Sequence, residues 1–129
     1  MRKIIFPLAL FLMVTLSCED LLEVPDISEH EVQLLAPLNG STVNDSTVNF
    51  TWDAVHEANS YLIQVATPNF DNASQYVLDS VMVVDSAFYG TKISKAMLDG
   101  TYEWRVKGMN SDYETTFSSN EFNVQNVSN

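Results

Sequence analysis

Short segments in which apolar and polar residues alternate follow one another from about residue 32 to residue 124. Side chains of a β-strand point to opposite faces in turn, so this alternation predicts strands that are buried on one face. The clearest segment spans residues 101–107. Its apolar positions are Tyr102, Trp104 and Val106, and its charged positions are Glu103, Arg105 and Lys107. A shift of one residue would bury the charges and expose the rings, so the pattern also predicts the register.

Seven strands are predicted in all. They are rich in Val, Ile, Tyr, Phe and Thr, and clusters of Asn, Asp, Gly, Pro and Ser separate them. The predicted strands are residues 32–36, 47–53, 61–66, 76–84, 88–89, 101–107 and 116–124. Only residues 94–98 could make a helical turn. Many short strands at close spacing predict an all-β fold, a seven-stranded antiparallel β-sandwich.

The aromatic residues divide into a predicted core set and a candidate surface set. The rings that fall on the apolar face of their strands are Phe50, Trp52, Tyr61, Tyr102 and Trp104. The rings left as candidate surface residues are Phe70, Tyr76, Phe88, Tyr89, Tyr113 and Phe117. Exposed rings stack on sugar faces, so three of the second set are candidate ligand-binding residues: Phe70, Tyr89 and Tyr113. Ordinary packing and loop anchoring is the competing explanation.

The predicted strands carry a resemblance to a known module. The stretches Phe50-Thr51-Trp52, residues 61–65 and residues 98–106 resemble a fibronectin type III domain, an immunoglobulin-like β-sandwich. The resemblance runs from about residue 31 to residue 127. It implies that Trp52 packs in the core and that Leu98 and Tyr102 form the family's tyrosine corner. Three residues separate that leucine from the tyrosine here, where the family usually has a proline and one other residue. A fold of this kind does not by itself imply an activity.

The first seventeen residues have the layout of a secretory leader. Arg2 and Lys3 precede an apolar run at residues 4–16, and the small residue Ser17 and Cys18 follow it. The run is shorter than the roughly 20 residues that a transmembrane helix needs. Ser17-Cys18 resembles a bacterial lipobox, which implies cleavage before Cys18 and acylation of that residue by chains such as palmitate. The alternative is an ordinary leader with an unpaired cysteine in an oxidising compartment.

Three parts of the chain are therefore expected: a leader at residues 1–17, an acylated N-terminus and flexible tether at residues 18–30, and a sandwich at residues 31–127. Loss of the leader lowers the basic count from 6 to 4 while all 17 acidic residues stay, so the net charge changes from −11 to −13. Such a domain repels phosphate backbones, so nucleic acid is not an expected partner. Membrane attachment is expected to come from lipid on Cys18, since several buried acyl chains hold a protein firmly.

Groups that could carry catalysis are few. The chain has two histidines, His30 in the tether and His56 in a loop, which is little material for a triad or a histidine metal site. None of the known nucleophile, zinc or phosphate-loop motifs is present in the sequence. Residues 69–72 offer oxygen ligands for calcium but match no known loop spacing. No cofactor, no metal and no enzymatic activity are expected.

Three Asp-Ser pairs resemble the acceptor for O-glycosylation of exported proteins in Bacteroidota. The candidate residues are Ser46, Ser80 and Ser86, and each follows an aspartate. The competing explanation is that Asp-Ser pairs begin turns.

These observations predict a non-catalytic outer-membrane lipoprotein of the Bacteroidota type, in which the sandwich acts in adhesion, assembly or ligand presentation at the cell envelope. Its partner is an unidentified protein or glycan, and it faces the cell surface or the periplasm. The alternative is a glycan-binding accessory lipoprotein of a polysaccharide-utilisation system, because the leader and sandwich resemble the N-terminal part of starch-utilisation lipoproteins. The third hypothesis is an enzyme, which would need a nucleophile or a pair of carboxylates in a pocket.

Overall fold

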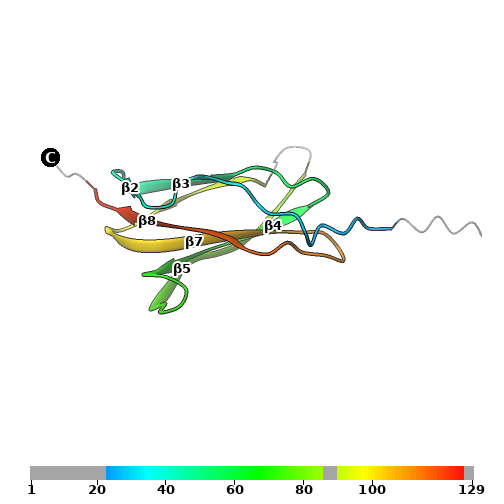
Figure 1. The fold of residues 1–129 in the computed structure, drawn as a ribbon. Helices are drawn as coiled ribbons and strands as arrows, with labels where there is room; N and C mark the ends of the chain where they lie inside the picture. Colours follow the sequence, from blue (N-terminus) through cyan, green and yellow to red (C-terminus); the bar gives the residue numbers. More distant parts are fainter. Residues whose placement is uncertain (1–22, 86–89, 127–129) are drawn as a thin grey trace, which may run out of the picture.

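Two β-sheets packed face to face make up the protein, as a computed structural model that describes residues 23–85 and 90–126 shows (Figure 1). The strands are β1 (Leu34–Ala36), β2 (Ser41–Val43), β3 (Thr47–Trp52), β4 (Ser60–Thr67), β5 (Gln75–Val83), β6 (Lys92–Ala96), β7 (Gly100–Met109) and β8 (Ser118–Val124). One sheet has the order β1-β3-β6 and the other has the order β2-β8-β7-β4-β5. The predicted all-β sandwich is confirmed.

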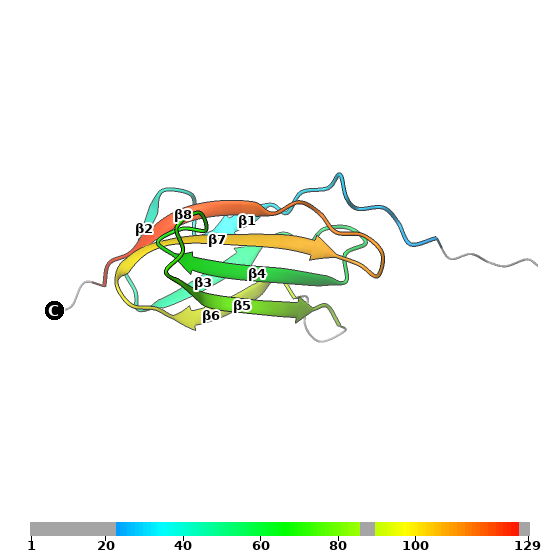
Figure 2. The same ribbon diagram turned by 90° about the horizontal axis from the view of Figure 1, so that it is seen from below.

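Strands β4 and β7 form the centre of the five-stranded sheet (Figure 2). They pair antiparallel, with Ile63 opposite Val106 and Val65 opposite Trp104. All four of these side chains are fully buried, because both strands place their apolar positions on the same face of the sheet. The register that the alternation predicts for β7 is therefore confirmed.

Aromatic rings from both sheets meet in the core. The five predicted core rings are all buried: Phe50, Trp52, Tyr61, Tyr102 and Trp104. Trp104 lies at their centre, with its ring centroid 5.1 Å from that of Phe50 and 6.4 Å from that of Trp52. Its indole Nε1 donates a hydrogen bond of 3.1 Å to the Pro37 carbonyl, which satisfies a polar group that burial would otherwise leave unpaired.

Two strands differ from the prediction. Residues 94–98, which could have made a helical turn, do not form one, because β6 runs through Ala96 and pairs antiparallel with β3. This pairing sets Ile93 opposite Phe50, and Ile93 packs against the core. Strand β2 was not predicted, since its three residues are too few for an alternation signal and it pairs parallel with β8. The predicted strand at residues 88–89 lies outside the described residues.

The hydrogen bond of the tyrosine corner is present, but the side chain of the corner's leucine is exposed. The Tyr102 hydroxyl donates to the Leu98 carbonyl at 2.6 Å. The Leu98 side chain, however, is 83% exposed, so it does not pack in the core. Met97 is the buried residue of this turn. Three residues lie between the leucine and the tyrosine, one more than the family usually has. In this longer turn Met97 is buried and Leu98 is not.

The stretch before β1 is packed against the sandwich where an exposed tether was expected. Ile27 is 1% exposed, and the Pro25 carbonyl accepts a hydrogen bond of 2.9 Å from Asn110 Nδ2. The prediction of an exposed segment is therefore wrong for Ile27, and packing begins before residue 31. Cys18 and the leader lie outside the described residues. Within residues 23–85 and 90–126, no helix is long and apolar enough to cross a membrane.

Candidate functional site

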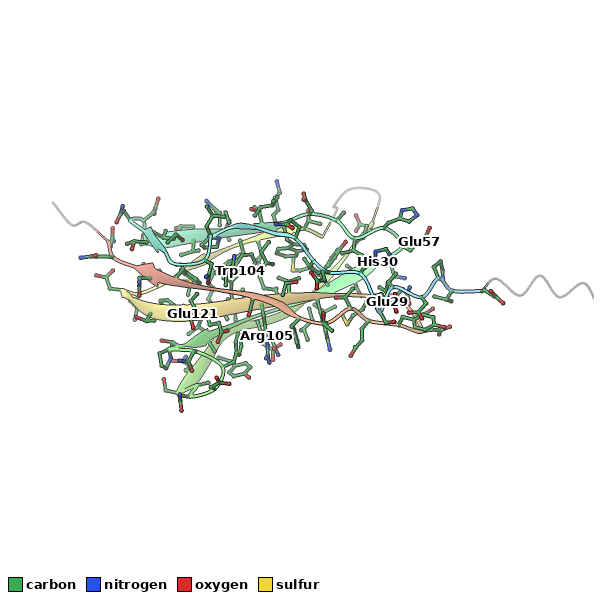
Figure 3. All side chains as sticks on the ribbon, viewed as in Figure 1. Glu29, His30, Glu57, Trp104, Arg105 and Glu121 are labelled. Carbon is green, nitrogen blue, oxygen red and sulfur yellow. The ribbon has the colours of Figure 1, made fainter. Side chains whose placement is uncertain are left out.

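The outer face of the five-stranded sheet carries charged side chains that point away from the core. Because successive side chains of β7 alternate, the burial of Trp104 places Arg105 on the opposite side of the strand. Figure 3 shows Trp104 between the two sheets and Arg105 beyond β7. Glu103 and Lys107 share the side of Arg105, as the alternation predicts, and all three are half-buried.

A row of stacked rings and cations crosses this face. The Arg105 guanidinium lies between two phenylalanines, with Cζ 3.9 Å from the ring centroid of Phe70 and 4.2 Å from that of Phe117. Lys107 Nζ lies 4.9 Å from the Phe117 centroid, and Tyr76 meets Phe70 edge to face at 5.5 Å. Cations are attracted to ring faces, so these contacts hold the row together. We call these five residues the cation–aromatic row.

Hydrogen bonds orient the centre of the row. Arg105 Nε donates to Gln64 Oε1 at 2.9 Å, and Gln64 Nε2 donates to Asp79 Oδ1 at 3.3 Å. These three side chains come from β7, β4 and β5, which are adjacent strands. The Phe70 backbone N–H donates to Glu103 Oε1 at 2.9 Å, which fixes the β4–β5 loop against β7. The guanidinium is therefore held in one plane between its two rings.

Apolar side chains remain exposed beside the row, on β5. Val81 is 59% exposed and Val83 is 60% exposed, and within the row itself Tyr76 is 45% exposed. Leu62 on β4 stands between Val81 and Lys107, since it is opposite both in the register. An exposed apolar strip next to a polar row is typical of a surface that a partner covers. The outer face of the five-stranded sheet is therefore the candidate site.

The two candidate ligand-binding aromatics that the structure describes, Phe70 and Tyr113, do not form one platform. Phe70 is held against β7 by Glu103, near the start of the strand, and Arg105 covers one of its faces. Tyr113 lies past the other end of β7, where its backbone N–H donates to Asn110 Oδ1 at 2.8 Å. Tyr89 lies outside the described residues. Binding of a ligand by any of the three stays a prediction.

The candidate glycosylation residues have different surroundings. Ser46 is exposed in the β2–β3 turn, where Asp45 Oδ1 accepts a hydrogen bond of 3.0 Å from the Thr47 backbone N–H. This bond is the local turn interaction expected of an Asp-Ser pair. Ser80 is half-buried in the middle of β5, opposite Ile63. Ser86 lies outside the described residues, and glycosylation of the three serines stays a prediction.

Titratable groups do not converge on a reactive site in the part of the chain that the structure describes. No group of three or more His, Cys, Asp or Glu residues there is placed to hold a metal ion. His56 Nε2 lies 3.1 Å from Glu57 Oε1, and both side chains are exposed. Asn69 Oδ1 accepts a hydrogen bond from the Asn72 backbone at 2.8 Å, so this calcium candidate serves the loop instead. Burial raises the pKa of Tyr61, whose hydroxyl accepts from the Val55 backbone N–H at 2.8 Å.

A depression of about 390 Å³ lies between the start of β5 and the β6–β7 turn. Two of its polar groups are already used by the fold. The Asp99 carboxylate accepts a hydrogen bond of 2.8 Å from the Asn126 backbone, and the Tyr102 hydroxyl donates to Leu98. Burial, and then the nearby Asp99 charge, raise the pKa of Tyr102. These two groups are therefore less available to a ligand, and the depression is a weaker candidate site than the outer face of the five-stranded sheet.

Comparison with known proteins supports the fold and no more. No family model matches the chain, and no curated protein matches it. Among solved structures, an engineered protein gives a TM-score of 0.54 at 13% identity over 73% of this chain, which spans only 20% of that protein. A protein named FN3tt gives a TM-score of 0.50 at 13% identity, over 74% of this chain and 97% of its own. CopC from Methylosinus trichosporium OB3b gives 0.49 at 12% identity, over 77% of this chain and 98% of its own.

Proposed function

We propose that the chain is a non-catalytic lipoprotein, anchored in the outer membrane through Cys18, that binds a partner at the cell envelope through the outer face of its five-stranded sheet. The observation that carries the binding role is the pair of exposed valines, Val81 and Val83, on the same face as the cation–aromatic row, whose Tyr76 is also exposed. Burial of these side chains is favourable by about 25 cal/mol per Å² of apolar area. Adhesion, assembly and ligand presentation are the roles that a surface of this kind serves.

The anchoring half of the proposal rests on the sequence. The basic residues, the apolar run and Cys18 follow one another in the order of a lipoprotein leader. The net charge of −13 that remains after loss of the leader disfavours direct contact of the domain with anionic lipid, so attachment through acyl chains is the consistent route.

The anchoring experiment compares the wild-type chain with Cys18→Ala in a bacterial host that processes lipoproteins. Metabolic labelling with an alkyne-tagged palmitate analogue and membrane fractionation are the measurements. We expect the wild-type chain to be labelled and to sediment with membranes, and Cys18→Ala to be unlabelled and released. Labelling of the variant, or membrane retention without label, would contradict the anchor. Protease treatment of intact cells then distinguishes surface display from a periplasmic orientation.

The binding experiment places a photo-crosslinking amino acid at Val81, on the proposed face, and at Asn49 as the matched control. Asn49 is exposed on β3, in the other sheet. In intact cells, we expect a specific cross-linked species from position 81 and none from position 49. Equal cross-linking at both positions, or none at either, would contradict a binding role for this face.

Glycan binding is the second candidate for the same face, and the Tyr76 ring favours it. Tyr76 is 45% exposed, and its ring contacts Phe70 edge to face. A sugar that stacks on an aromatic face would use Tyr76 before Phe70, whose face Arg105 covers on one side. A glycan array probed with the wild-type chain and with Tyr76→Ala tests this: binding that the substitution abolishes supports it, and a silent array counts against it.

A further inference from the structure

Strand β5 differs from the other edge strands of the described part of the protein. Strands β1 and β2 have three residues each, which is too short to guide a partner strand. Strand β6 carries Lys92 and Lys95, and lysine on an edge opposes further pairing. Strand β5 has nine residues and contains no lysine, arginine or proline. Its irregularity, a register shift at Val77, lies near its start, and its one charged residue is Asp79, so the six residues 78–83 form a regular edge without lysine or proline.

The outer edge of β5 offers backbone groups as well as side chains. In the sheet order, β5 is the last strand and pairs with β4 alone. Antiparallel pairing on one side leaves every second residue of an edge strand with its N–H and C=O directed outward. In Figure 2, β5 lies along the free margin of the five-stranded sheet. An extended segment could hydrogen-bond along this margin and continue the sheet.

Both faces of β5 provide apolar contacts for an added strand. On the outer face, Val81 and Val83 are exposed. On the other face, Leu78 and Met82 are partly buried against the core, so one side of each is still accessible. An added strand with apolar residues at alternate positions would cover the exposed valines through cross-strand pairs, which contribute roughly 0.2–1 kcal/mol each.

The middle of β5 sets the charge of the partner. Asp79 is exposed at the centre of the strand and accepts a hydrogen bond from Gln64, so its second carboxylate oxygen is available for a further donor. The side chain opposite Asp79 on an added strand would lie at the end of the polar series formed by Arg105, Gln64 and Asp79. A lysine or arginine there pairs with the carboxylate, whereas an acidic residue is repelled.

Charge also decides against a second copy of this chain as the occupant. Two molecules with a net charge of −11, or −13 after loss of the leader, repel each other. Antiparallel self-pairing centred on β5 would place Asp79 opposite its own copy, and like charges directly opposite are destabilising. A basic partner avoids both penalties.

We propose that β5 accepts an extended strand from a partner protein, with apolar residues at alternate positions and a basic residue opposite Asp79. This inference rests on the proposed binding role of the sheet face and does not depend on the anchor at Cys18. It identifies the partner as a polypeptide with a defined side-chain pattern.

The test uses the full chain in detergent and two fluorescent peptides of nine residues, the length of β5. Both peptides alternate valine and threonine, and the central residue is lysine in one and glutamate in the other. A central position lies opposite Asp79 in either strand direction. Fluorescence anisotropy measures binding, and hydrogen–deuterium exchange locates it. We expect slowed exchange in β5 with the lysine peptide and at least tenfold weaker binding of the glutamate peptide.

Three variants sharpen the test. Val81→Lys adds an edge lysine at an exposed position and should weaken binding of the lysine peptide at least tenfold. Asp79→Lys should reverse the preference toward the glutamate peptide. Leu38→Lys is the matched control, because Leu38 is an exposed apolar residue of the β1–β2 turn, and it should bind as the wild-type chain does.

Four results would overturn the inference. They are an absence of protection in β5, protection confined to other strands, an equal loss of binding in Leu38→Lys, and protection of β5 in the chain alone that rises with its concentration. The last result would identify a second copy as the occupant. If position 81 gives a specific cross-link in cells and any of these four results is also obtained, the proposed binding role stands. Only the inference that β5 accepts an added strand is then rejected.

Discussion

Replacement of Arg105 by lysine tests whether the cation–aromatic row stabilises the sheet. Arg105→Lys keeps the positive charge but removes the planar guanidinium that lies 3.9 Å from Phe70 and 4.2 Å from Phe117. Each contact at a partly exposed site contributes about 0.5–1 kcal/mol. The hydrogen bond of 2.9 Å to Gln64 adds a net contribution of about 0.5–1.5 kcal/mol. Lysine recovers part of the charge interaction, so we expect the free energy of unfolding to fall by about 1.5 kcal/mol.

Urea unfolding at neutral pH, followed by the fluorescence of the buried Trp52 and Trp104, measures this change. The control is Lys95→Arg, the opposite exchange at an exposed position of β6, which should stay within about 0.5 kcal/mol of the wild-type value. A loss below about 0.5 kcal/mol in Arg105→Lys would refute the stabilising role of the row. A double-mutant cycle with Phe117→Leu should give a positive coupling energy if stacking is the cause.

Two further predictions concern the buried tyrosines. Tyr102→Phe removes the hydrogen bond to the Leu98 carbonyl and should lower the free energy of unfolding by about 1 kcal/mol, whereas Leu98→Ala should be nearly neutral because that side chain is exposed; urea titrations that give the reverse order would contradict this account of the corner. Burial raises the pKa of Tyr61 in the folded protein. As the pH rises above about 10, the unfolded chain therefore loses this phenolic proton before the folded protein does. The free energy of unfolding falls until the pH has passed the folded-state pKa. In urea titrations between about pH 8 and pH 11, Tyr61→Phe should show a shallower loss than the wild-type chain, and identical slopes would exclude Tyr61 as a source.

The parts of the fold that the sequence predicts correctly are those with a sustained period of two. Strands β3, β4 and β7 each have at least three apolar positions in alternation, and burial of one face fixes their register. Ile27 carried no such signal, because it stands alone in a polar stretch and is buried by a tertiary contact. The same holds for Met97 and Leu98. The backbone path of one turn decides that Met97 is buried and that Leu98 is exposed.

The candidate site was predictable only in part. Alternation places Arg105 on the outer face, and composition marks Phe70 and Phe117 as rings without a core position. Their stacking on one guanidinium depends on two loops from different parts of the chain, and neither loop has a periodic pattern that would reveal its path. The unguarded edge of β5 could be seen in the sequence as a segment without lysine or proline, but its position at the margin of the sheet could not.

The hydrogen bond from Asn110 holds the N-terminal segment at one end of the sandwich and so makes the two ends of the molecule different. Asn110 binds the Pro25 carbonyl beside the β7–β8 hairpin, and the chain passes residue 126 at the opposite end of the sandwich (Figure 1). With lipid on Cys18, the seven peptide links between Cys18 and Pro25 could span at most roughly 25 Å. The β7–β8 hairpin would then stay near the headgroups, while the β6–β7 turn, where Asp99 binds the Asn126 backbone, would lie at the end farthest from the bilayer (Figure 1, Figure 2).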